Sequence, residues 1–417
     1  MKVLHVIPSV SERSGGPGQA IIPMCRSLQE QGTVVMIVTT DHEMASSCSF
    51  QVASTMSADV GHQGSSMPTQ QSLIRNSKLE IRNYQGVPTI FFPLQWGESF
   101  KYSRPLATWL DANVNKFDVV HIHAVFNHAC VAAATACRKH HVPYVVRPLG
   151  TLDPWSMRQK PLRKFLFWQV AGKRMLRGAA GVHYTARAEQ TAAEESLGVN
   201  HGRVIPLGVE TDLPARTHVD EVVFDKLPGL SGRPYVLVLS RLHPKKGLDI
   251  FVDAFLSLAG KREYEGWRLV LAGEGPDEYV QALKQRVSTH RAEEIVFFPG
   301  WVEGSEKDAF LRGAALLALP SYQENFGMCV MEALACGVPV FVSPHVNLAD
   351  EIEAAGAGWI AAVNKQAIET VLAEVLSCED ERARRGNAGK ILSREFSWES
   401  IAARLNEMYS AISQGKN

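Results

Sequence analysis

The chain has 417 residues, of which 46% are hydrophobic, and its 43 Lys and Arg are balanced by 43 Asp and Glu. This length favours two or three domains with a large buried core, and the composition excludes disordered and collagen-like chains. A formal net charge of zero argues against a dedicated nucleic-acid-binding protein, which is usually strongly basic, so no nucleic acid is expected as a partner.

Seven cysteines are present, and none belongs to a C-x-x-C pair. An odd number without such pairs is typical of buried thiols in a reducing compartment rather than of a disulfide framework or a zinc site. The sequence has no run of 18 apolar residues, and the short apolar N-terminus predicts a first strand rather than a signal peptide. We therefore expect a cytoplasmic protein, with peripheral contact at the inner face of the cytoplasmic membrane left open.

Short apolar runs rich in β-branched residues predict thirteen strands. They cover residues 2–8, 33–40, 88–94, 118–125, 143–147, 181–184, 203–207, 235–240, 267–272, 294–298, 315–320, 339–343 and 358–363. Helix-length segments lie between most of them, for example 18–31, 248–258, 277–288 and 325–336. Apolar strands that alternate with helices predict parallel sheets covered on both faces, and thirteen strands fit two doubly wound α/β domains better than one.

A polar segment broken by four prolines lies between Pro206 and Pro234 and predicts a domain boundary. We expect Rossmann-like domains over 1–205 and 234–395, a linker over 206–233, and a C-terminal helix over 396–417 that crosses back to the first domain. A Ser-, Gln- and Gly-rich stretch, 46–77, predicts a mobile loop or insertion.

Two glutamates eight residues apart, Glu324 and Glu332, follow the predicted strand 315–320. On spacing alone such a pair is usually two surface acids. Here a strand, a loop and a helix follow one another, and the start of a helix offers free N–H groups and a positive dipole that suit a diphosphate.

Two cations, Arg241 and Lys246, follow the first strand of the second domain, at the strand end where α/β proteins bind ligands. Together they could neutralise a diphosphate leaving group, although a solvated loop would give the same pattern. The next strand runs into Gly273-Glu274-Gly275-Pro276, which alone is ordinary turn chemistry.

The stretch from Glu324 to Val340 resembles the signature of the retaining family 4 glycosyltransferases, group 1, and the segment from Arg241 to Gly247 resembles their R-L-x-x-x-K-G pattern. One departure is Asn325, where many members have glycine. The resemblance implies the GT-B fold, in which two Rossmann-like domains face each other across a cleft and the C-terminal one binds most of the sugar nucleotide. The first domain would then be the acceptor-side domain.

The resemblance also implies individual roles in the second domain. Glu324 would face the donor sugar and Glu332 the ribose, while Arg241 and Lys246 would bind the diphosphate. The residues implied to contact the donor are Gly16, Arg241, Lys246, Gly273, Val302, Glu324, Asn325, Phe326, Gly327 and Glu332. Val302 would act through its backbone, so the nucleotide cannot be identified from its side chain.

In the first domain, the glycine-rich stretch 14–18 does not match the dinucleotide fingerprint G-x-G-x-x-G. The resemblance implies that Gly16 reaches the donor diphosphate, although a structural turn is also open. His121 and His123 share a face of their strand, and the resemblance places the second of them, His123, near the sugar as a catalytic residue. Thr151 and Asp153, after the strand 143–147, are candidates for contact with the acceptor or the donor sugar, or for a capping or turn role.

No Asp-x-Asp motif occurs, which agrees with a metal-independent mechanism without a cofactor. The expected function is retaining transfer of a hexosyl unit from a nucleotide diphosphate sugar, UDP- or GDP-linked, to a glycan or lipid-linked acceptor. The catalytic residues would be Glu324, His123, Arg241 and Lys246, and the setting would be assembly of polysaccharide, lipopolysaccharide or glycolipid. Two alternatives are a GT-B sugar-nucleotide 2-epimerase and a non-catalytic, membrane-docked sugar-nucleotide-binding protein.

The segment 159–177 combines six Lys and Arg with Phe165, Leu166, Phe167 and Trp168. Such a helix can lie on an anionic membrane, or it can face the core with a solvated basic side. Residues 1–205 carry a net charge of +8 and residues 206–417 a net charge of −8, so the overall zero is a cancellation between two charged halves. A basic first half suits an anionic membrane or a phosphate-bearing acceptor.

Overall fold

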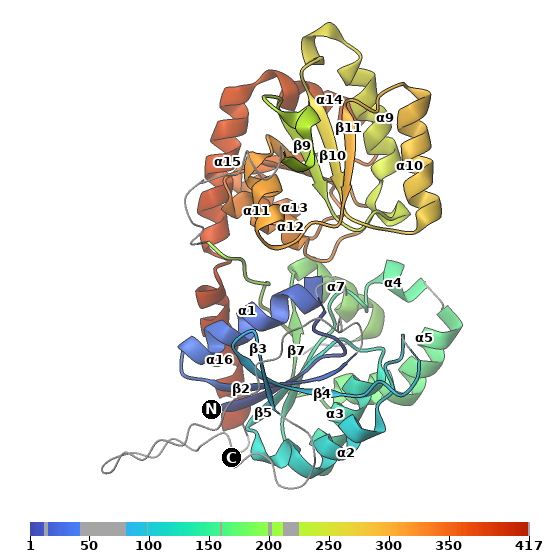
Figure 1. Cartoon of the computed structure of the whole chain (residues 1–417). Helices are drawn as coiled ribbons and strands as arrows, with labels where there is room; N and C mark the ends of the chain where they lie inside the picture. Colours follow the sequence, from blue (N-terminus) through green and yellow to red (C-terminus); the bar gives the residue numbers. More distant parts are fainter. Residues whose placement is uncertain are drawn as a thin grey trace. The chain divides into compact units, whose positions relative to one another are not determined.

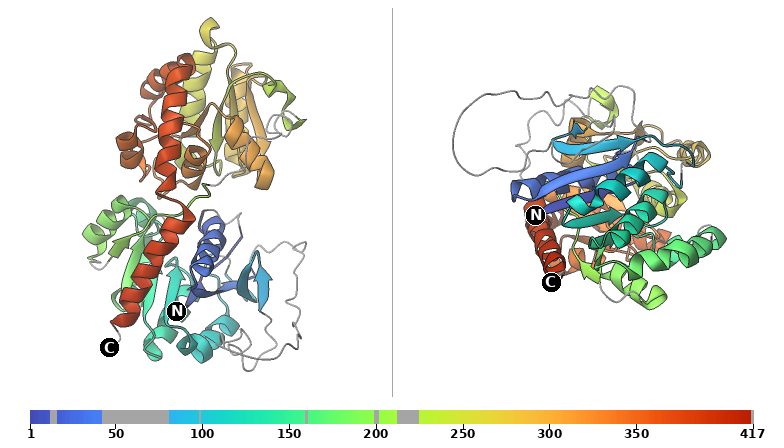
Figure 2. Two further views of the ribbon diagram at one scale, coloured as in Figure 1. Left: turned by 90° about the vertical axis from the view of Figure 1, so that its left-hand side faces the viewer. Right: turned by 90° about the horizontal axis from the view of Figure 1, so that it is seen from below.

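The computed structural model describes residues 1–11, 16–41, 81–97, 99–158, 161–198, 202–211 and 225–415 (Figure 1). The loop expected over 46–77 and residues 212–224 of the expected linker lie outside these residues. The chain divides into two compact units, Met1–Gly208 with Trp398–Asn417, and Val209–Ser397. The C-terminal helix α16 (Trp398–Gln414) therefore belongs to the first unit, where it runs beside α1 (Gly16–Glu30) (Figure 2).

The first unit is built on an eight-stranded sheet with the strand order β3-β4-β2-β1-β5-β6-β7-β8. Its strands are β1 (Lys2–Val6), β2 (Val34–Thr40), β3 (Arg82–Tyr84), β4 (Val87–Phe92), β5 (Val119–His123), β6 (Tyr144–Arg147), β7 (Gly181–Tyr184) and β8 (Gly202–Val204). All neighbours are parallel except β3 and β4. The strand β3 was not predicted, because three residues of low apolar content, Arg-Asn-Tyr, carry no strand pattern.

The two faces of this sheet differ in chemistry. One face carries Leu4, Val120 and Val146 and packs in an apolar core with α2 (Arg104–Asn113) and α3 (His128–Lys139). The other face, beneath α1 and α16, carries a buried polar layer that includes four histidines and Arg147. The remaining helices of this unit are α4 (Pro154–Arg158), α5 (Pro161–Phe167), α6 (Lys173–Arg177) and α7 (Arg187–Leu197).

The second unit has a six-stranded parallel sheet with the order β11-β10-β9-β12-β13-β14. Its strands are β9 (Tyr235–Leu239), β10 (Arg268–Ala272), β11 (Val296–Gly300), β12 (Leu316–Leu319), β13 (Val340–Val342) and β14 (Gly358–Ile360). This is the doubly wound order of dinucleotide-binding folds, and it reverses direction between β9 and β12. The expected fold class of two Rossmann-like α/β domains is confirmed.

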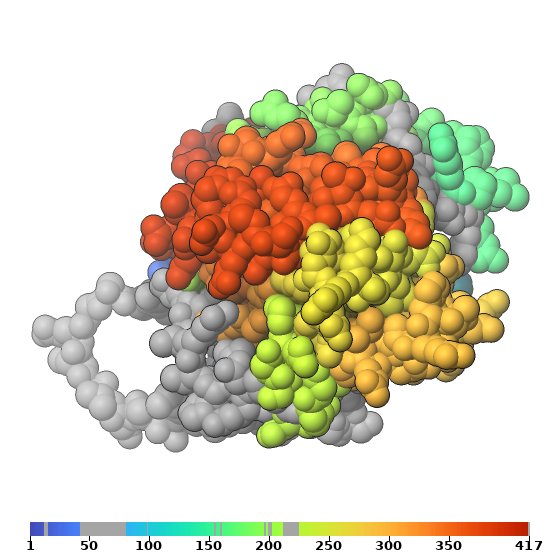
Figure 3. All heavy atoms as spheres, turned by 90° about the horizontal axis from the view of Figure 1, so that it is seen from above, coloured from blue at the N-terminus to red at the C-terminus, as the bar shows by residue number. Residues whose placement is uncertain are grey.

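Helices cover both faces of the second sheet. They are α9 (Leu248–Ala259), α10 (Asp277–Thr289), α11 (Gly304–Gly313), α12 (Met328–Ala335), α13 (Ala349–Ala355), α14 (Lys365–Ser377) and α15 (Glu379–Arg394). The apolar core on one face is formed with α9, α10 and α14. Figure 3 looks onto the surface where the segments that precede β9 (yellow-green) and β10 (yellow) lie side by side. Because β9 and β10 are parallel, the loops that follow them lie together at the opposite edge of the sheet.

Candidate functional site

The loops that follow β9, β10 and β12 are tied together at the carboxyl edge of the second sheet. The backbone N–H of Leu242, after β9, donates to the carbonyl of Glu274, after β10 (2.8 Å). The N–H of Tyr322, after β12, donates to the carbonyl of Lys245 in the β9 loop (2.9 Å). Ligands of doubly wound sheets bind where the strand order reverses, and the β9 and β12 loops flank that point.

Lys246 and Glu324, predicted from two separate motifs, form an ion pair at this edge. Their side chains are 12% and 20% exposed, so the pair is shielded but reachable. Burial alone would raise the pKa of the Glu324 carboxyl, but the charge and hydrogen bond of Lys246 outweigh it and hold the pKa below its ordinary value. Glu324 is therefore a carboxylate at neutral pH, and the Lys246 ammonium keeps further N–H donors for an anion.

The β9 loop concentrates positive charge. Burial lowers the pKa of His243, and the charges of Arg241, Lys245 and Lys246 lower it further, which shows that these cations act on one point. The Arg241 side chain is exposed. A short turn (Pro244–Lys246) holds Lys246 in place and ends at Gly247. A positive potential at this edge suits a diphosphate group.

Gly273 allows the β9 and β10 loops to approach closely. Its φ is +141°, and a Cβ atom there would lie 1.9 Å from the carbonyl oxygen of Ser240. No other residue type fits without moving the backbone. The glycine turn predicted after this strand thus has a packing reason, and it leaves the Gly273 backbone at the ligand edge of the sheet.

The second glutamate, Glu332, pairs with a residue that the sequence analysis did not identify. Its carboxylate accepts from Lys307 Nζ on α11 (2.8 Å), and both side chains are about one-fifth exposed. The helix α12 that carries Glu332 begins at Met328, three residues later than expected, because Gly327 with φ +77° forms its N-cap. Glu332 therefore lies about one turn into the helix rather than two.

Three further residues with an implied donor contact differ in how they are held. The Asn325 N–H donates to Glu324 Oε1 (3.2 Å), and its side chain accepts from Asn347 Nδ2 (3.4 Å), so the asparagine side chain has a partner at this position. Phe326 is 3% exposed and packs against Phe396. Val302 is 4% exposed, so both Phe326 and Val302 could contact a ligand through the backbone only.

In the first unit, the loop after β6 holds the acceptor candidates Thr151 and Asp153. Thr151 Oγ1 donates to the Pro148 carbonyl (2.6 Å), a turn contact. Glu189 is a buried carboxylate that was not identified from the sequence. It accepts a hydrogen bond from the N–H of Gly150, a residue with φ +70°. Glu189 is 3% exposed and fixes this loop.

Gly16, the predicted donor contact of the first domain, is the first residue of α1.

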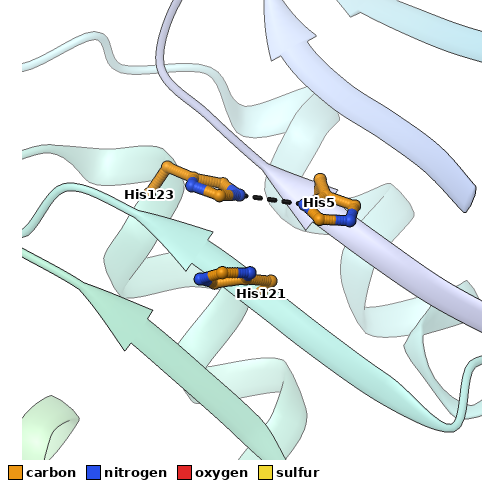
Figure 4. A group of neighbouring side chains, drawn as sticks. All are labelled: His5, His121 and His123. Carbon is orange, nitrogen blue, oxygen red and sulfur yellow. Dashed lines mark hydrogen bonds between the residues drawn. The ribbon is translucent and has the colours of Figure 1, made fainter. Parts of the chain in front are cut away.

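His123 is fully buried in the polar layer of the first unit (Figure 4). Its Nε2 lies 3.0 Å from His5 Nδ1, and its ring centroid lies 4.3 Å from that of His121. The prediction that His121 and His123 share a face is confirmed. The proximity of His123 to a donor sugar stays a prediction.

The hydrogen bonds of the layer define the tautomers of two histidines. Burial and the charge of Arg147 lower the pKa of His183 to about 3, so it is neutral. Its Nε2–H donates to the Ile205 carbonyl (2.7 Å), which leaves Nδ1 to accept from His121 Nε2–H (3.2 Å). His121 Nδ1 then accepts from the Tyr409 hydroxyl on α16 (2.7 Å).

His5, His121 and His123 bring nitrogen atoms within 4.8 Å of one another, a spacing that a metal ion could use. Both ring nitrogens of His121 are engaged, however, and the buried guanidinium of Arg147 lies close enough to lower the pKa of all three rings. A divalent cation bound there would be repelled by the positive charge of Arg147, and the cluster contains no carboxylate ligand to offset that repulsion. The cluster therefore fits a hydrogen-bonded layer better than a metal site.

Comparisons with known proteins agree with this architecture. Residues 220–392 match the family described as glycosyl transferases group 1, and residues 15–208 match the glycosyl transferase 4-like domain. A GDP-mannose-dependent phosphatidylinositol monomannoside mannosyltransferase of Mycolicibacterium smegmatis is 28% identical over 54% of this chain and 60% of the relative. A mannosylfructose-phosphate synthase of Agrobacterium fabrum is 32% identical over 36% of this chain and 34% of the relative. The matches thus span less than two thirds of these relatives.

Solved structures are similar over nearly the whole chain. Anabaena HepE, crystallised with UDP and glucose, has a TM-score of 0.74 at 20% identity and covers 99% of this chain and 100% of its own. WaaG, described as a glycosyltransferase involved in lipopolysaccharide biosynthesis, has a TM-score of 0.65 at 13% identity, with 98% and 99% covered. At such identities the likeness concerns the fold. With the two family matches, it shows that the chain belongs to the family 4, group 1 glycosyltransferases of the GT-B fold.

Proposed function

We propose that the protein transfers a hexosyl unit from a nucleotide diphosphate sugar to an acceptor hydroxyl, with retention of configuration and without a metal. The observation that carries this proposal is the shielded ion pair between Lys246, in the positively charged β9 loop, and Glu324, in the loop after β12, at the switch point of the second sheet. A carboxylate beside two cations suits a ligand that combines sugar hydroxyls with a diphosphate.

Each residue has a distinct role in this proposal. Arg241 and Lys246 neutralise the charge that develops on the leaving diphosphate. Glu324 accepts hydrogen bonds from sugar hydroxyls, and Glu332, held by Lys307, accepts from the ribose. The leaving phosphate takes the acceptor proton on the same face of the sugar, so the glutamates position the donor and are not nucleophiles.

The donor class is supported by similar proteins whose names or titles include GDP-mannose or UDP-glucose. A UDP- or GDP-sugar is therefore proposed here, with a glycan or lipid-linked acceptor in cell-surface polysaccharide, lipopolysaccharide or glycolipid assembly. Thr151 and Asp153 are proposed to contact the acceptor, and Gly16 and His123 the donor. Among the described residues, no helix is both long and apolar enough to span a bilayer.

Product analysis tests this proposal. The protein is incubated with labelled UDP- and GDP-sugars and with candidate acceptors, and the products are separated by chromatography. Transfer predicts free nucleoside diphosphate together with a labelled glycoside whose anomeric configuration is that of the donor. An epimerised sugar nucleotide, an inverted glycoside, or a reaction that stops when divalent ions are chelated would each refute a part of the proposal.

A further inference from the structure

The helical segment 161–177 of the first unit exposes an apolar face. The helix α5 continues through a π-helical turn (Trp168–Gly172) into α6, so the whole segment is one helix. Leu162, Phe165, Leu166 and Val170 are 71%, 56%, 56% and 80% exposed. Their spacing of three, one and four residues places them on one side of the helix.

This exposed face is not the side by which the segment packs on its own domain. Trp168, Met175 and Leu176 are 7% exposed or less, and the Phe167 ring lies 5.2 Å from that of Phe126. The segment thus has a buried apolar side and, separately, an uncovered apolar side. Figure 2 shows it (green) projecting from the first unit. A large apolar face that is exposed to water is typical of a site that binds a membrane or another protein.

The charge around this face is of one sign. Residues 154–188 contain eight Lys and Arg and no Asp or Glu. Arg158, Arg163, Arg174 and Arg177 are exposed. This stretch alone carries +8, the entire net excess counted over residues 1–205, so the basic character of the first half is concentrated beside the apolar face.

We infer that this face, defined by Leu162, Phe165, Leu166 and Val170 and fringed by arginines, docks on an anionic lipid bilayer. The apolar side chains enter the boundary between headgroups and acyl chains while the arginines contact lipid phosphates, as in interfacial amphipathic helices. A second copy of the chain is a poorer occupant, because pairing the two faces would bring two strongly basic segments together. The inference does not depend on the proposed transfer reaction.

Sedimentation with vesicles tests it on the full chain, without any sugar nucleotide. Vesicles of phosphatidylcholine alone are compared with vesicles that contain about 30% phosphatidylglycerol. The wild type is expected to bind the anionic vesicles at least about tenfold more tightly, and to dissociate when salt is raised from about 0.05 to 0.5 M. Equal binding to both vesicles, or binding to neither, would overturn the inference.

Matched variants distinguish binding through this face from nonspecific adsorption of the protein to vesicles. The Leu166→Ser/Val170→Ser double variant is expected to lose at least about tenfold in binding, because two apolar side chains no longer enter the bilayer. Arg163→Gln is expected to lose about fivefold on anionic vesicles only. Ile391→Ser, which changes an apolar residue 66% exposed on α15, is the control and should bind like the wild type.

The thermal midpoints of these variants should equal that of the wild type, since all the altered side chains are exposed. If the double variant binds vesicles as tightly as the wild type does, the face is not a membrane contact. If instead light scattering finds a wild-type dimer that the double variant abolishes, with no vesicle binding by either, the face is a self-association surface and the inference is wrong.

Discussion

Acidification should destabilise the first unit well above the pH at which carboxylates titrate. Burial, with the charge of Arg147, lowers the pKa values of His5 and His183 to about 3, and lowers those of His121 and His123 well below the ordinary value. The folded state therefore resists protonation, whereas in the unfolded chain these rings take up protons near pH 6.5. The stability that the neutral histidines contribute is complete above about pH 6.5 and is lost progressively as the pH falls towards 3.

The magnitude follows from proton linkage. At about pH 5.5, a histidine with an unfolded pKa of about 6.5 and a folded pKa far below that loses about 1.4 kcal/mol of stability relative to neutral pH. His5 and His183 together account for about 3 kcal/mol, and the full set of four for roughly 6 kcal/mol. Solvent screening does not weaken this effect on stability, because all four rings are 0% exposed. Such a loss is comparable with the whole stability of a domain.

Calorimetry at constant ionic strength measures this loss. Between about pH 7.5 and 5.5 the unfolding midpoint of the first unit should fall by roughly 12–24 °C, at 2–4 °C for each kcal/mol in a unit of this size. His5→Leu should reduce the pH slope by about a quarter, whatever its effect on stability at neutral pH. His290→Gln, on an exposed side chain of the second unit, should leave the slope unchanged. A midpoint that stays constant over this range, or an unchanged slope in His5→Leu, would refute the reasoning.

Three further predictions concern single side chains. Lys246→Ala should lower transfer by about 10²–10³-fold through lost stabilisation of the leaving group, while Lys365→Ala, which breaks an exposed ion pair, should transfer normally; equal rates in both would refute the assigned role. Gly273→Ala should abolish donor binding in calorimetry, because its Cβ would collide with a backbone carbonyl, and normal binding would contradict this. Glu189→Gln should lower the free energy of unfolding in urea by about 1–3 kcal/mol, since an amide nitrogen replaces a buried acceptor oxygen. An unchanged urea midpoint would contradict this stabilising role.

Much of the fold could be predicted because its strands are buried on both faces. Continuous apolar runs such as Tyr235–Leu239 and Leu316–Leu319 mark central strands, and the ligand loops follow from the carboxyl-end rule for parallel sheets. The edge strand β3 could not be predicted, because it has no buried face that imposes an apolar pattern. The start of α12 depended on the left-handed conformation of Gly327, which spacing does not encode.

The candidate site was predicted unevenly for the same physical reason. Lys246 and Glu324 lie in recognisable local motifs, so both could be proposed from the sequence, and the structure adds that they pair. Lys307 was missed because the partner of a charged side chain is set by tertiary packing. The polar layer did carry a signal, since histidines such as His5 and His183 interrupt otherwise apolar strands, but only the strand order shows that they meet.

The central claim is that the β9 and β12 loops of the second unit bind a nucleotide diphosphate sugar, and ligand-induced thermal stabilisation tests it most directly. Wild type and Lys246→Ala are heated with UDP-, GDP- and ADP-sugars, all at one concentration that is about 100 times the dissociation constant of the wild type for the donor that it binds most tightly. One donor class should stabilise the wild type by about 2.7 kcal/mol. The same donor should have little effect on the variant at that concentration. Equal stabilisation of both proteins, or of neither by any donor, would contradict the account.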